Sequence, residues 1–195
     1  MPPLILASTS AYRRALLERL RLPFEVAAPN VDEAALAGEA PRSTALRLAQ
    51  AKAHAVAVSW PDAIVIGSDQ VAVLNGKPLG KPGTHEAALA QLMAMRGRVV
   101  VFHTAVAVIN AAADKREVQE IPTSVRFRMF SEFQAQRYLE LDRPYDCAGS
   151  AKIESLGIAL VETVESADPT ALIGLPLIAL VGMLERAGVE VLAAG

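Results

Sequence analysis

The sequence contains a single cysteine, Cys147, and only three histidines. One cysteine excludes an internal disulfide and a cysteine cluster that would hold zinc. Such low cysteine usage is typical of a reducing compartment, so we expect the protein in the cytoplasm. The histidines have no partners at metal-ligand spacing, and the sequence has no Gly-x-Ser-x-Gly or His-Glu-x-x-His pattern. Hydrolases that use a serine nucleophile or zinc therefore find no support.

An excess of positive charge is also absent. The chain has 19 basic and 21 acidic residues, for a formal net charge of -2. This balance argues against a surface that binds long nucleic acid, but it does not exclude a small anionic ligand. The charge is uneven along the chain, because the first 22 residues hold four arginines and one acidic residue, Glu18.

No hydrophobic run is long enough to span a bilayer, which needs roughly 20 apolar residues. The longest apolar stretch, residues 171–184, is interrupted by Gly174, Pro176 and Gly182. We expect it to form a core helix rather than a membrane anchor. The first residues lack the basic segment and apolar core of a signal peptide, so we expect no targeting segment.

The remaining composition is that of an ordinary globular chain. Among 195 residues, 52% are hydrophobic and 21% are charged, which predicts a single domain over residues 1–195. Apolar runs that predict strands occur at residues 4–7, 24–27, 63–67, 99–110, 118–130 and 157–164, and the runs at 99–110 and 118–130 would pair as an antiparallel ribbon. Residues 71–74 followed by Asn75–Gly76 predict a hairpin turn. Patterns that predict helices begin after Ser10, cover residues 41–59, 84–96 and 131–141, and follow Asp168. Thr84 and Asp168 are the predicted N-caps of their helices, and Ser131 with Gln134 matches a capping box. This alternation indicates an α/β fold around a mixed sheet, with two lobes and a cleft between them.

The first candidate site lies where the first predicted strand passes into a helix. Ser8, Ser10, Arg13 and Arg14 offer hydroxyls and guanidinium groups beside the positive end of a helix dipole, which favours a phosphate. The alternative is that Ser10 only caps the helix and that the arginines lie on a solvated face.

The second candidate is Asp69, which follows the predicted strand at residues 63–67. Ligands bind at the carboxyl ends of strands in open α/β sheets, and a carboxylate there can hold a divalent metal or take a proton from water. Glu33 could supply a second ligand from a loop. The alternatives are a turn-capping aspartate and a solvated glutamate.

Three lysines and one glutamate complete the set. Lys52 lies on an alanine-rich helix, Lys81 stands between a glycine and a proline, and Lys152 and Glu154 belong to an irregular segment. Lysines that converge on a phosphate chain would stabilise its charge. Glu154 could accept two parallel hydrogen bonds from the edge of a guanine. Taken singly, each of these residues is more typical of a solvated surface.

The order of these motifs resembles the Maf family of nucleoside triphosphate pyrophosphatases from about residue 4 to about residue 188. The resemblance is carried by Leu-Ile-Leu-Ala-Ser-Thr-Ser (4–10), Arg-Arg (13–14), Val-Asp-Glu (31–33), Ala-Gln-Ala-Lys (49–52), Ile-Gly-Ser-Asp-Gln (66–70), Gly-Lys-Pro (80–82), Cys-Ala-Gly (147–149) and Gly-Leu-Pro-Leu (174–177). It implies an elongated, mixed β-sheet flanked by helices, as in inosine triphosphate pyrophosphatases, with two lobes and the substrate in a central cleft. It also implies a divalent metal cation, Mg or Mn, and a homodimer.

Within this family the chain resembles the branch that acts on 7-methyl-GTP. The indicators are Tyr12, Gln70 and the Ser-Ala-Lys-Ile-Glu segment that ends at Glu154, where the dTTP/UTP branch typically has glutamine. Ala11 departs from the proline common in the first motif, without removing a functional group. The positive charge of a 7-methylguanine ring favours an aromatic face and a carboxylate, which Tyr12 and Glu154 would supply.

The resemblance leads to a hypothesis for catalysis. Glu33 and Asp69 would help to hold the metal, or Asp69 would act as the base, so that water attacks the α-phosphorus. Lys52, Lys81 and the two arginines would neutralise the departing pyrophosphate, while Ser8, Ser10, Gln70 and Lys152 would contact substrate. Two alternatives stay open: a dTTP/UTP pyrophosphatase, and a nucleotide-binding regulator of cell division that hydrolyses nothing.

Overall fold

The computed structural model describes residues 2–193. Within these residues the chain forms five α-helices and a seven-stranded sheet. The α-helices are α1 (Ala11–Glu18), α2 (Pro41–Ala57), α3 (His85–Met95), α4 (Glu132–Asp142) and α5 (Leu177–Arg186). The strands are β1 (Leu4–Ala7), β2 (Glu25–Ala27), β3 (Ile64–Leu74), β4 (Lys77–Leu79), β5 (Val99–Asn110), β6 (Lys115–Phe127) and β7 (Val161–Ser166). Three short 3₁₀ helices are η1 (Ala148–Ser150), η2 (Leu156–Leu160) and η3 (Ala171–Ile173).

The strand order is β2-β1-β3-β5-β6-β7, and β4 pairs with β3. The sheet is mixed, because β1 runs parallel to β2 and β3, whereas the β3–β4 and β6–β7 pairs are antiparallel. The expected α/β class with a mixed sheet is therefore confirmed.

The described residues gather into two compact units. The first unit holds residues 2–69, 104–121 and 168–193, and the second holds residues 70–103 and 122–167. Strands β3, β5 and β6 contribute residues to both units. The single domain over residues 1–195 stays a prediction. No helix in residues 2–193 is both long enough and apolar enough to span a membrane.

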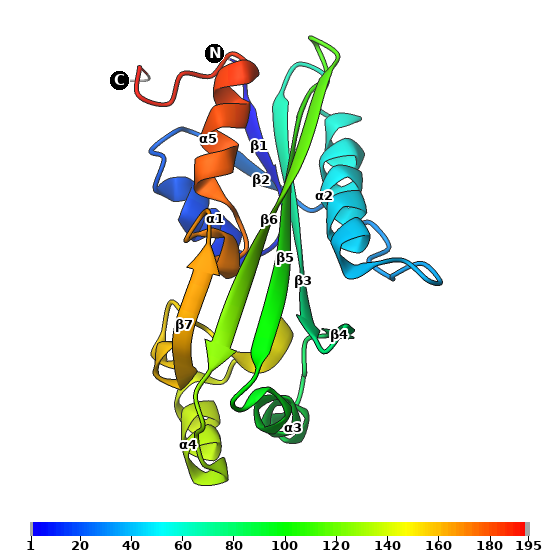
Figure 1. Ribbon diagram of the computed structural model, residues 1–195. Coiled ribbons are helices and arrows are strands. Elements are labelled where there is room, and N and C mark those ends of the chain that lie inside the picture. The colour runs from blue at the N-terminus through cyan, green and yellow to red at the C-terminus, as the bar shows by residue number, and fades with distance from the viewer. Residues whose placement is uncertain (1, 194–195) are drawn as a thin grey trace. The chain divides into compact units, whose positions relative to one another are not determined.

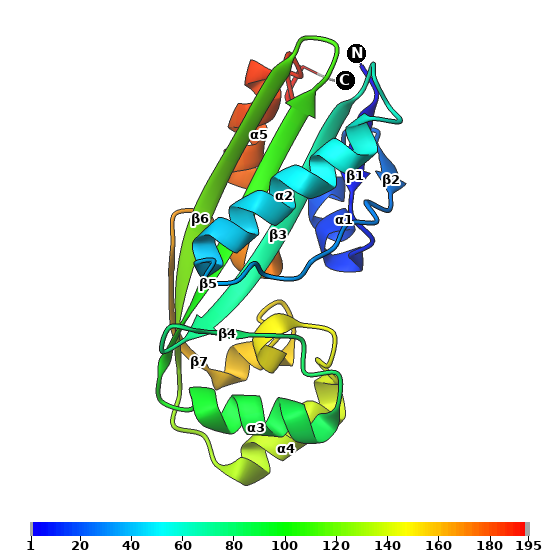
Figure 2. The ribbon, with the colours of Figure 1, turned by 90° about the vertical axis from the view of Figure 1, so that its right-hand side faces the viewer.

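In the first unit, helices cover both faces of the sheet. Helices α1 and α5 lie on one face, and α2 lies on the other (Figure 1). Leu16 of α1 and Leu180 of α5 belong to one buried cluster with Leu6 and Ile66 of the strands. On the opposite face, α2 runs across the strands and buries its alanine-rich side (Figure 2). Burial on both faces explains why β1 and the start of β3 are continuously apolar.

In the second unit, α3 and α4 pack against each other. The helix starts follow their sequence signals. Thr84 caps α3 by accepting a hydrogen bond from the Ala87 N–H. Ser131 and Gln134 form the capping box expected at the start of α4.

The predicted end of the strand at residue 67 is wrong. Strand β3 continues to Leu74, and Asp69 lies in its interior rather than at its carboxyl end. The extension is stabilised by antiparallel pairing with β4 across the Asn75–Gly76 turn, where both residues have positive φ. Polar residues are tolerated within β3 because Ser68 and Asp69 both have buried hydrogen-bond partners.

Three other predicted elements differ from the structure. The predicted strand at residues 157–164 begins as η2, and only β7 from Val161 is extended. The ribbon strand predicted at residues 118–130 lies earlier, as β6. The apolar stretch at residues 171–184 is not one helix, because Gly174 has a φ of +120° and separates η3 from α5.

Asp168 does not occupy the N-cap position that the sequence indicated. The N-cap of α5 is Pro176, which has no side-chain donor or acceptor for the role. Asp168 lies well before this helix in the chain, but its carboxylate accepts the Ile178 and Ala179 N–H groups at 2.6 and 3.3 Å. Asp168 therefore accepts N–H groups of this helix, as a cap does, although it is not the N-cap residue. The helix begins at Leu177, eight residues after the predicted start at residue 169.

Candidate active site

The segment between β1 and α1 forms a strand-to-helix turn, as expected. The buried Ser8 hydroxyl accepts the Ser10 N–H at 3.1 Å. Ser10 is the N-cap of α1, and its hydroxyl accepts the Arg13 N–H at 3.4 Å. Tyr12, in the first turn of this helix, is partly buried. Both serine hydroxyls therefore shape the backbone at the positive end of α1.

The two arginines that follow have different surroundings. Arg13 donates from Nε to the Gly174 carbonyl at 2.9 Å. Arg14 has a side chain that is 65% exposed, and it pairs with Glu18 one turn further along α1 at 3.0 Å. Arg14 therefore lies on a solvated face of the helix, which was the alternative to a phosphate site. Arg13 instead points toward Gly174 of the first unit.

The Gly174 carbonyl is a shared acceptor in the first unit. It accepts both the Arg13 guanidinium and the buried Ser68 hydroxyl, the latter at 2.8 Å. Sequence reasoning missed Ser68 as a supporting residue. The available signal was a hydroxyl directly before Asp69 at the end of an apolar run.

Glu33, Lys52 and Asp69 come together as a triad. The buried Lys52 ammonium lies 2.7 Å from Glu33 Oε1 and 2.7 Å from Asp69 Oδ1. The three residues are far apart in sequence and belong to the loop after β2, to α2 and to β3. Their meeting supports the functional interpretation of Asp69 and Glu33 over that of a turn cap and a solvated loop residue.

Close packing of α2 on β3 makes this meeting possible. A Cβ atom on Gly67 would lie 2.2 Å from the Ala49 carbonyl oxygen and 2.7 Å from the Ala53 nitrogen. Only glycine permits the helix backbone to approach β3 so closely. Gly67 and Asp69 share a face of the strand, because side chains alternate. The close approach therefore brings Lys52, between Ala49 and Ala53, to the Asp69 carboxylate.

Burial raises the pKa of Asp69 above its ordinary value. Attraction to Lys52 and Arg13 opposes this shift, and repulsion from Glu33 adds to it. Burial also lowers the pKa of the Arg13 guanidinium, against the attraction of Asp69 and Glu33. A carboxylate with a raised pKa is a better proton acceptor than an exposed aspartate, so the triad is suited to taking a proton from water.

The other predicted site residues belong to the second unit. Gln70 is partly buried and follows Asp69 in β3, with its side chain on the opposite face of the strand. Lys81 is exposed in the segment between β4 and α3. The carbonyl of the preceding Gly80 accepts the Gln91 side-chain amide at 3.0 Å.

Gln91 also accepts the Ser150 hydroxyl, at 2.6 Å. One side chain of α3 therefore connects the Gly-Lys-Pro motif to the 3₁₀ helix η1 that follows Cys147. Sequence reasoning did not single out Gln91. No local pattern marks it, because its role depends on two segments about 70 residues apart in the chain.

Lys152 and Glu154 lie in the irregular segment that was expected. The Lys152 N–H donates to the Tyr138 hydroxyl at 2.9 Å, and burial raises the pKa of that phenol. Lys152 Nζ lies 3.5 Å from Asp146 Oδ1. Glu154 is exposed in the following turn, which is tied to α4 through Ser155 and Asp142.

A profile of the family described as Maf-like protein matches residues 3–187. The chain belongs to the Maf-like protein family. The structure thus groups several Maf motifs within each unit: Glu33, Lys52 and Asp69 in the first, and Gly80 and Ser150 around Gln91 in the second.

Curated Maf relatives are similar to this chain over nearly its whole length. A protein of Aromatoleum aromaticum is 60% identical over 95% of this chain and 95% of its own length. Proteins of Thiobacillus denitrificans and Cupriavidus metallidurans are each 58% identical, over 98% and 96% of this chain and 95% and 94% of their own lengths. All three relatives are named 7-methyl-GTP pyrophosphatase.

Two solved structures share the fold. A HAM1 protein from Coxiella burnetii covers 95% of this chain with a TM-score of 0.54 and 16% sequence identity, and all of that protein is covered. The Staphylococcus aureus Ham1 protein gives the same TM-score at 15% identity, with 95% of this chain and 99% of that protein covered. At these identities the likeness extends to the fold alone.

Proposed function

We propose that this Maf-like protein hydrolyses 7-methyl-GTP to 7-methyl-GMP and pyrophosphate, which removes a modified nucleotide from the cellular pool. The water oxygen would bond to the α-phosphorus, the bond from that phosphorus to the α,β-bridging oxygen would break, and the water would release its proton. The observation that carries the proposal is the Glu33–Lys52–Asp69 triad, in a chain 58–60% identical to relatives named for this reaction.

Asp69 is the proposed base, because its buried carboxylate has a raised pKa. The ammonium of Lys52 holds this carboxylate at 2.7 Å and fixes its orientation. Lys52, Lys81, Arg13 and Arg14 would balance the negative charge that develops on the departing pyrophosphate. Ser8 and Ser10 would contact the phosphate chain from the start of α1.

The base would be recognised by a second set of residues. Tyr12 offers an aromatic face and Glu154 a carboxylate, which together suit a positively charged 7-methylguanine. Gln70 and Lys152 are the other proposed contacts with substrate. The exposure of Glu154 supports this role, since its carboxylate is accessible to a ligand.

Glu33 is the proposed ligand of a divalent cation, Mg or Mn, and Asp69 is the alternative second ligand, a role that would replace its role as base. In residues 2–193 no group of three or more His, Cys, Asp or Glu side chains could hold a metal. Two carboxylates nevertheless fit Mg²⁺, which commonly binds through one or two carboxylates together with substrate phosphates and water. Each carboxylate has about four lone-pair sites, so one bond to Lys52 does not exhaust its capacity. When bound, such a cation offsets phosphate charge and lowers the pKa of a coordinated water.

The decisive experiment is incubation with 7-methyl-GTP, GTP, dTTP and UTP, with Mg²⁺ and Mn²⁺ in turn, followed by mass analysis of the products. We expect 7-methyl-GMP and pyrophosphate from the first substrate. A preference for dTTP or UTP would contradict the proposed substrate, orthophosphate release would contradict attack at the α-phosphorus, and no release would indicate a nucleotide-binding module.

Asp69→Asn tests the proposed base. We expect kcat to fall by about 10²–10⁴-fold because the variant cannot accept the proton from water. Asp62→Asn, at an exposed position just before β3, is the matched control. Circular dichroism should show that both variants fold. Turnover by the Asp69 variant near the wild-type rate would refute the assignment.

A cytoplasmic location, expected from the cysteine content, and a homodimer, expected from the family resemblance, both stay predictions. The single cysteine supports a reducing compartment. Light scattering of the purified chain gives its mass in solution, and a monomer at micromolar concentration would contradict the dimer.

A further inference from the structure

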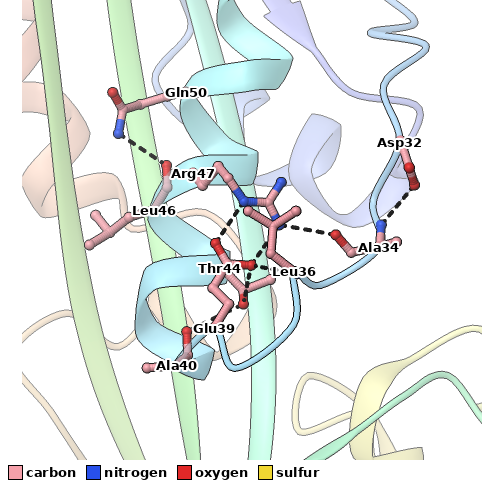
Figure 3. Close-up of polar contacts among 9 residues, drawn as sticks. All are labelled: Asp32, Ala34, Leu36, Glu39, Ala40, Thr44, Leu46, Arg47 and Gln50. Atoms are coloured by element: carbon pink, nitrogen blue, oxygen red, sulfur yellow. Dashed lines mark hydrogen bonds and ion pairs between the residues drawn. The ribbon is translucent and has the colours of Figure 1, made fainter.

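The loop that carries Glu33 has no helix or strand, yet side chains hold it at several points. It joins β2 to α2 across residues 28–40. The Asp32 carboxylate accepts the Ala34 N–H at 2.9 Å, and the Glu39 carboxylate accepts the Leu36 N–H at 3.1 Å (Figure 3). The backbone that follows Glu33 is therefore held by hydrogen bonds at the Ala34 and Leu36 amides.

Arg47 of α2 fastens this loop to the helix. Its Nε and Nη2 atoms donate to the two carboxylate oxygens of Glu39, each at 2.7 Å, in a bidentate pair. Nη2 also donates to the Ala34 carbonyl at 3.0 Å, and the Thr44 hydroxyl donates to Glu39 at 3.0 Å (Figure 3). The side chain of Glu39 is only 10% exposed. We refer to Arg47 and Glu39 as the latch.

The contact between Glu33 and Lys52 does not by itself explain why the loop is ordered. The Glu33 side chain is 56% exposed, and an ion pair with so exposed a partner contributes little to stability. The latch acts on the residue that follows, because Arg47 binds the Ala34 carbonyl. Arg47 and Lys52 belong to the same helix, so the latch sets the Glu33 backbone relative to the ammonium that Glu33 contacts.

We propose that Arg47 and Glu39 are positioning residues, which hold the Glu33 carboxylate beside Lys52 so that it is placed to bind the divalent cation. Both residues act through the backbone of the loop, because Arg47 binds the carbonyl of Ala34, the residue after Glu33. The inference rests on the proposed function only in assigning Glu33 as a metal ligand.

Three substitutions test the latch. Arg47→Met removes the charge and all donors, whereas Arg47→Lys keeps the charge but cannot form the planar two-bond fork. Glu39→Gln keeps the shape of the acceptor and removes its charge. The matched control is Arg186→Met, because Arg186 forms the same kind of bidentate pair with Glu117 in the first unit, at 3.0 and 2.6 Å, without contacting the loop.

The first measurement needs neither metal nor nucleotide. We expect the Ala34 and Leu36 amides to exchange hydrogen about tenfold faster in Arg47→Met, because the loop opens more often. In Arg47→Met, the amides of β3 should exchange as in the wild type. In the Arg186→Met control, the Ala34 and Leu36 amides should also exchange as in the wild type. Arg47→Lys and Glu39→Gln should lie between wild type and Arg47→Met, and they serve as the test if Arg47→Met does not fold.

The second measurement is titration with Mn²⁺ alone, followed by turnover as a function of Mn²⁺ concentration. Loss of a residue that orients a metal ligand typically weakens metal affinity by about tenfold or more. We expect this shift for Arg47→Met, a matching rise in the Mn²⁺ needed for half-maximal turnover, and recovery of kcat at high Mn²⁺. A purely structural role would lower the unfolding temperature without changing either Mn²⁺ parameter.

The outcomes separate this inference from the proposed function. Faster loop exchange with unchanged Mn²⁺ affinity and half-saturation would overturn the inference, as would a wild-type chain that binds no Mn²⁺. A wild-type chain that hydrolyses no nucleotide would refute the proposed function. In that case, weaker Mn²⁺ binding by Arg47→Met would still support the positioning role.

Discussion

Lys52 shares one ammonium between two carboxylates, one partly exposed and one buried. The buried partner, Asp69, keeps a raised pKa because loss of hydration outweighs the attraction of the lysine. Attraction to Lys52 therefore lowers the pKa of the buried carboxylate, but not as far as the pKa of an exposed aspartate. This balance makes the charge state of Asp69 sensitive to any change at Lys52.

Lys52→Met should destabilise the fold in a pH-dependent way. Removing the lysine raises the pKa of Asp69 further, so the folded state binds a proton that the unfolded state has released. The free energy of unfolding then decreases as pH rises from the ordinary aspartate pKa of 3.8 through the folded value. We expect the deficit relative to wild type to be about 3 kcal/mol at neutral pH and smaller at pH about 4.

Urea unfolding at the two pH values measures this difference, with Lys77→Met at an exposed position of β4 as the control. An equal deficit at both pH values would contradict the role assigned to the buried carboxylate.

Glu154→Gln tests recognition of the modified base. The carboxylate should favour a positively charged 7-methylguanine, and the neutral amide should not. We expect the ratio of kcat/KM for 7-methyl-GTP to that for GTP to fall by about tenfold, the factor that corresponds to one net hydrogen bond. Glu162→Gln, exposed on β7, is the matched control. An unchanged ratio would show that Glu154 does not determine the base preference.

At the scale of the element, β3 and α2 together create the triad. The predicted helix at residues 41–59 corresponds closely to α2, because its alanine-rich sequence has no internal glycine or proline. The predicted strand at residues 63–67 was too short, because pairing with β4 extends β3 beyond the apolar run that identified it. Local composition identified both elements, but only the pairing partner determined where β3 ends.

Gly67→Ala should separate these two elements. The added Cβ would clash with backbone atoms of α2 at 2.2 and 2.7 Å, and backbone cannot rotate away as a flexible side chain can. We expect the free energy of unfolding to fall by about 3 kcal/mol, and turnover to fall as Lys52 moves away from Asp69. Chemical denaturation and pyrophosphate release measure the two effects.

Gly80→Ala is the control for that experiment, because a Cβ there has no neighbour within 4 Å and φ is not positive. If Gly67→Ala were as stable as Gly80→Ala, close packing of α2 on β3 would not be the constraint proposed.

At the scale of the whole molecule, the near-neutral net charge does not show which charged side chains pair with one another. The arginine-rich start of the chain is one example, since Arg13 is directed toward Gly174 while Arg14 pairs with Glu18 at the surface. Glu39 is another, since hydrogen bonding to Arg47 lowers the pKa of its carboxyl from 4.5 to about 2. Such a depressed pKa links the stability of the fold to pH.

The contribution of Glu39 to stability should be lost in acid. Its folded pKa lies below its unfolded value, so the contribution is fully present above pH 4.5 and disappears as pH falls toward 2. The difference in free energy of unfolding between wild type and Glu39→Gln should therefore shrink over this range. Denaturant unfolding at pH 6 and pH about 3 tests this linkage, and a difference that does not change with pH would contradict it.

The sequence by itself determined the local elements and the family. The serine N-caps, the Asn75–Gly76 turn and the alanine-rich helix depend on residues near one another in the chain, so local patterns identified them. The order of the Maf motifs likewise needed no coordinates. Glu33, Lys52 and Asp69 were singled out in the same way, as residue types suited to metal and phosphate chemistry.

Only the tertiary structure decided which of these side chains meet. The approach of α2 to Gly67, the bond from Arg13 to Gly174 and the latch each join residues from separate elements. Their distances depend on strand register and on how closely backbones pack, which no local pattern encodes. The chemistry available to this chain follows from its residue types, but their arrangement into one triad follows from the packing of a helix on a glycine.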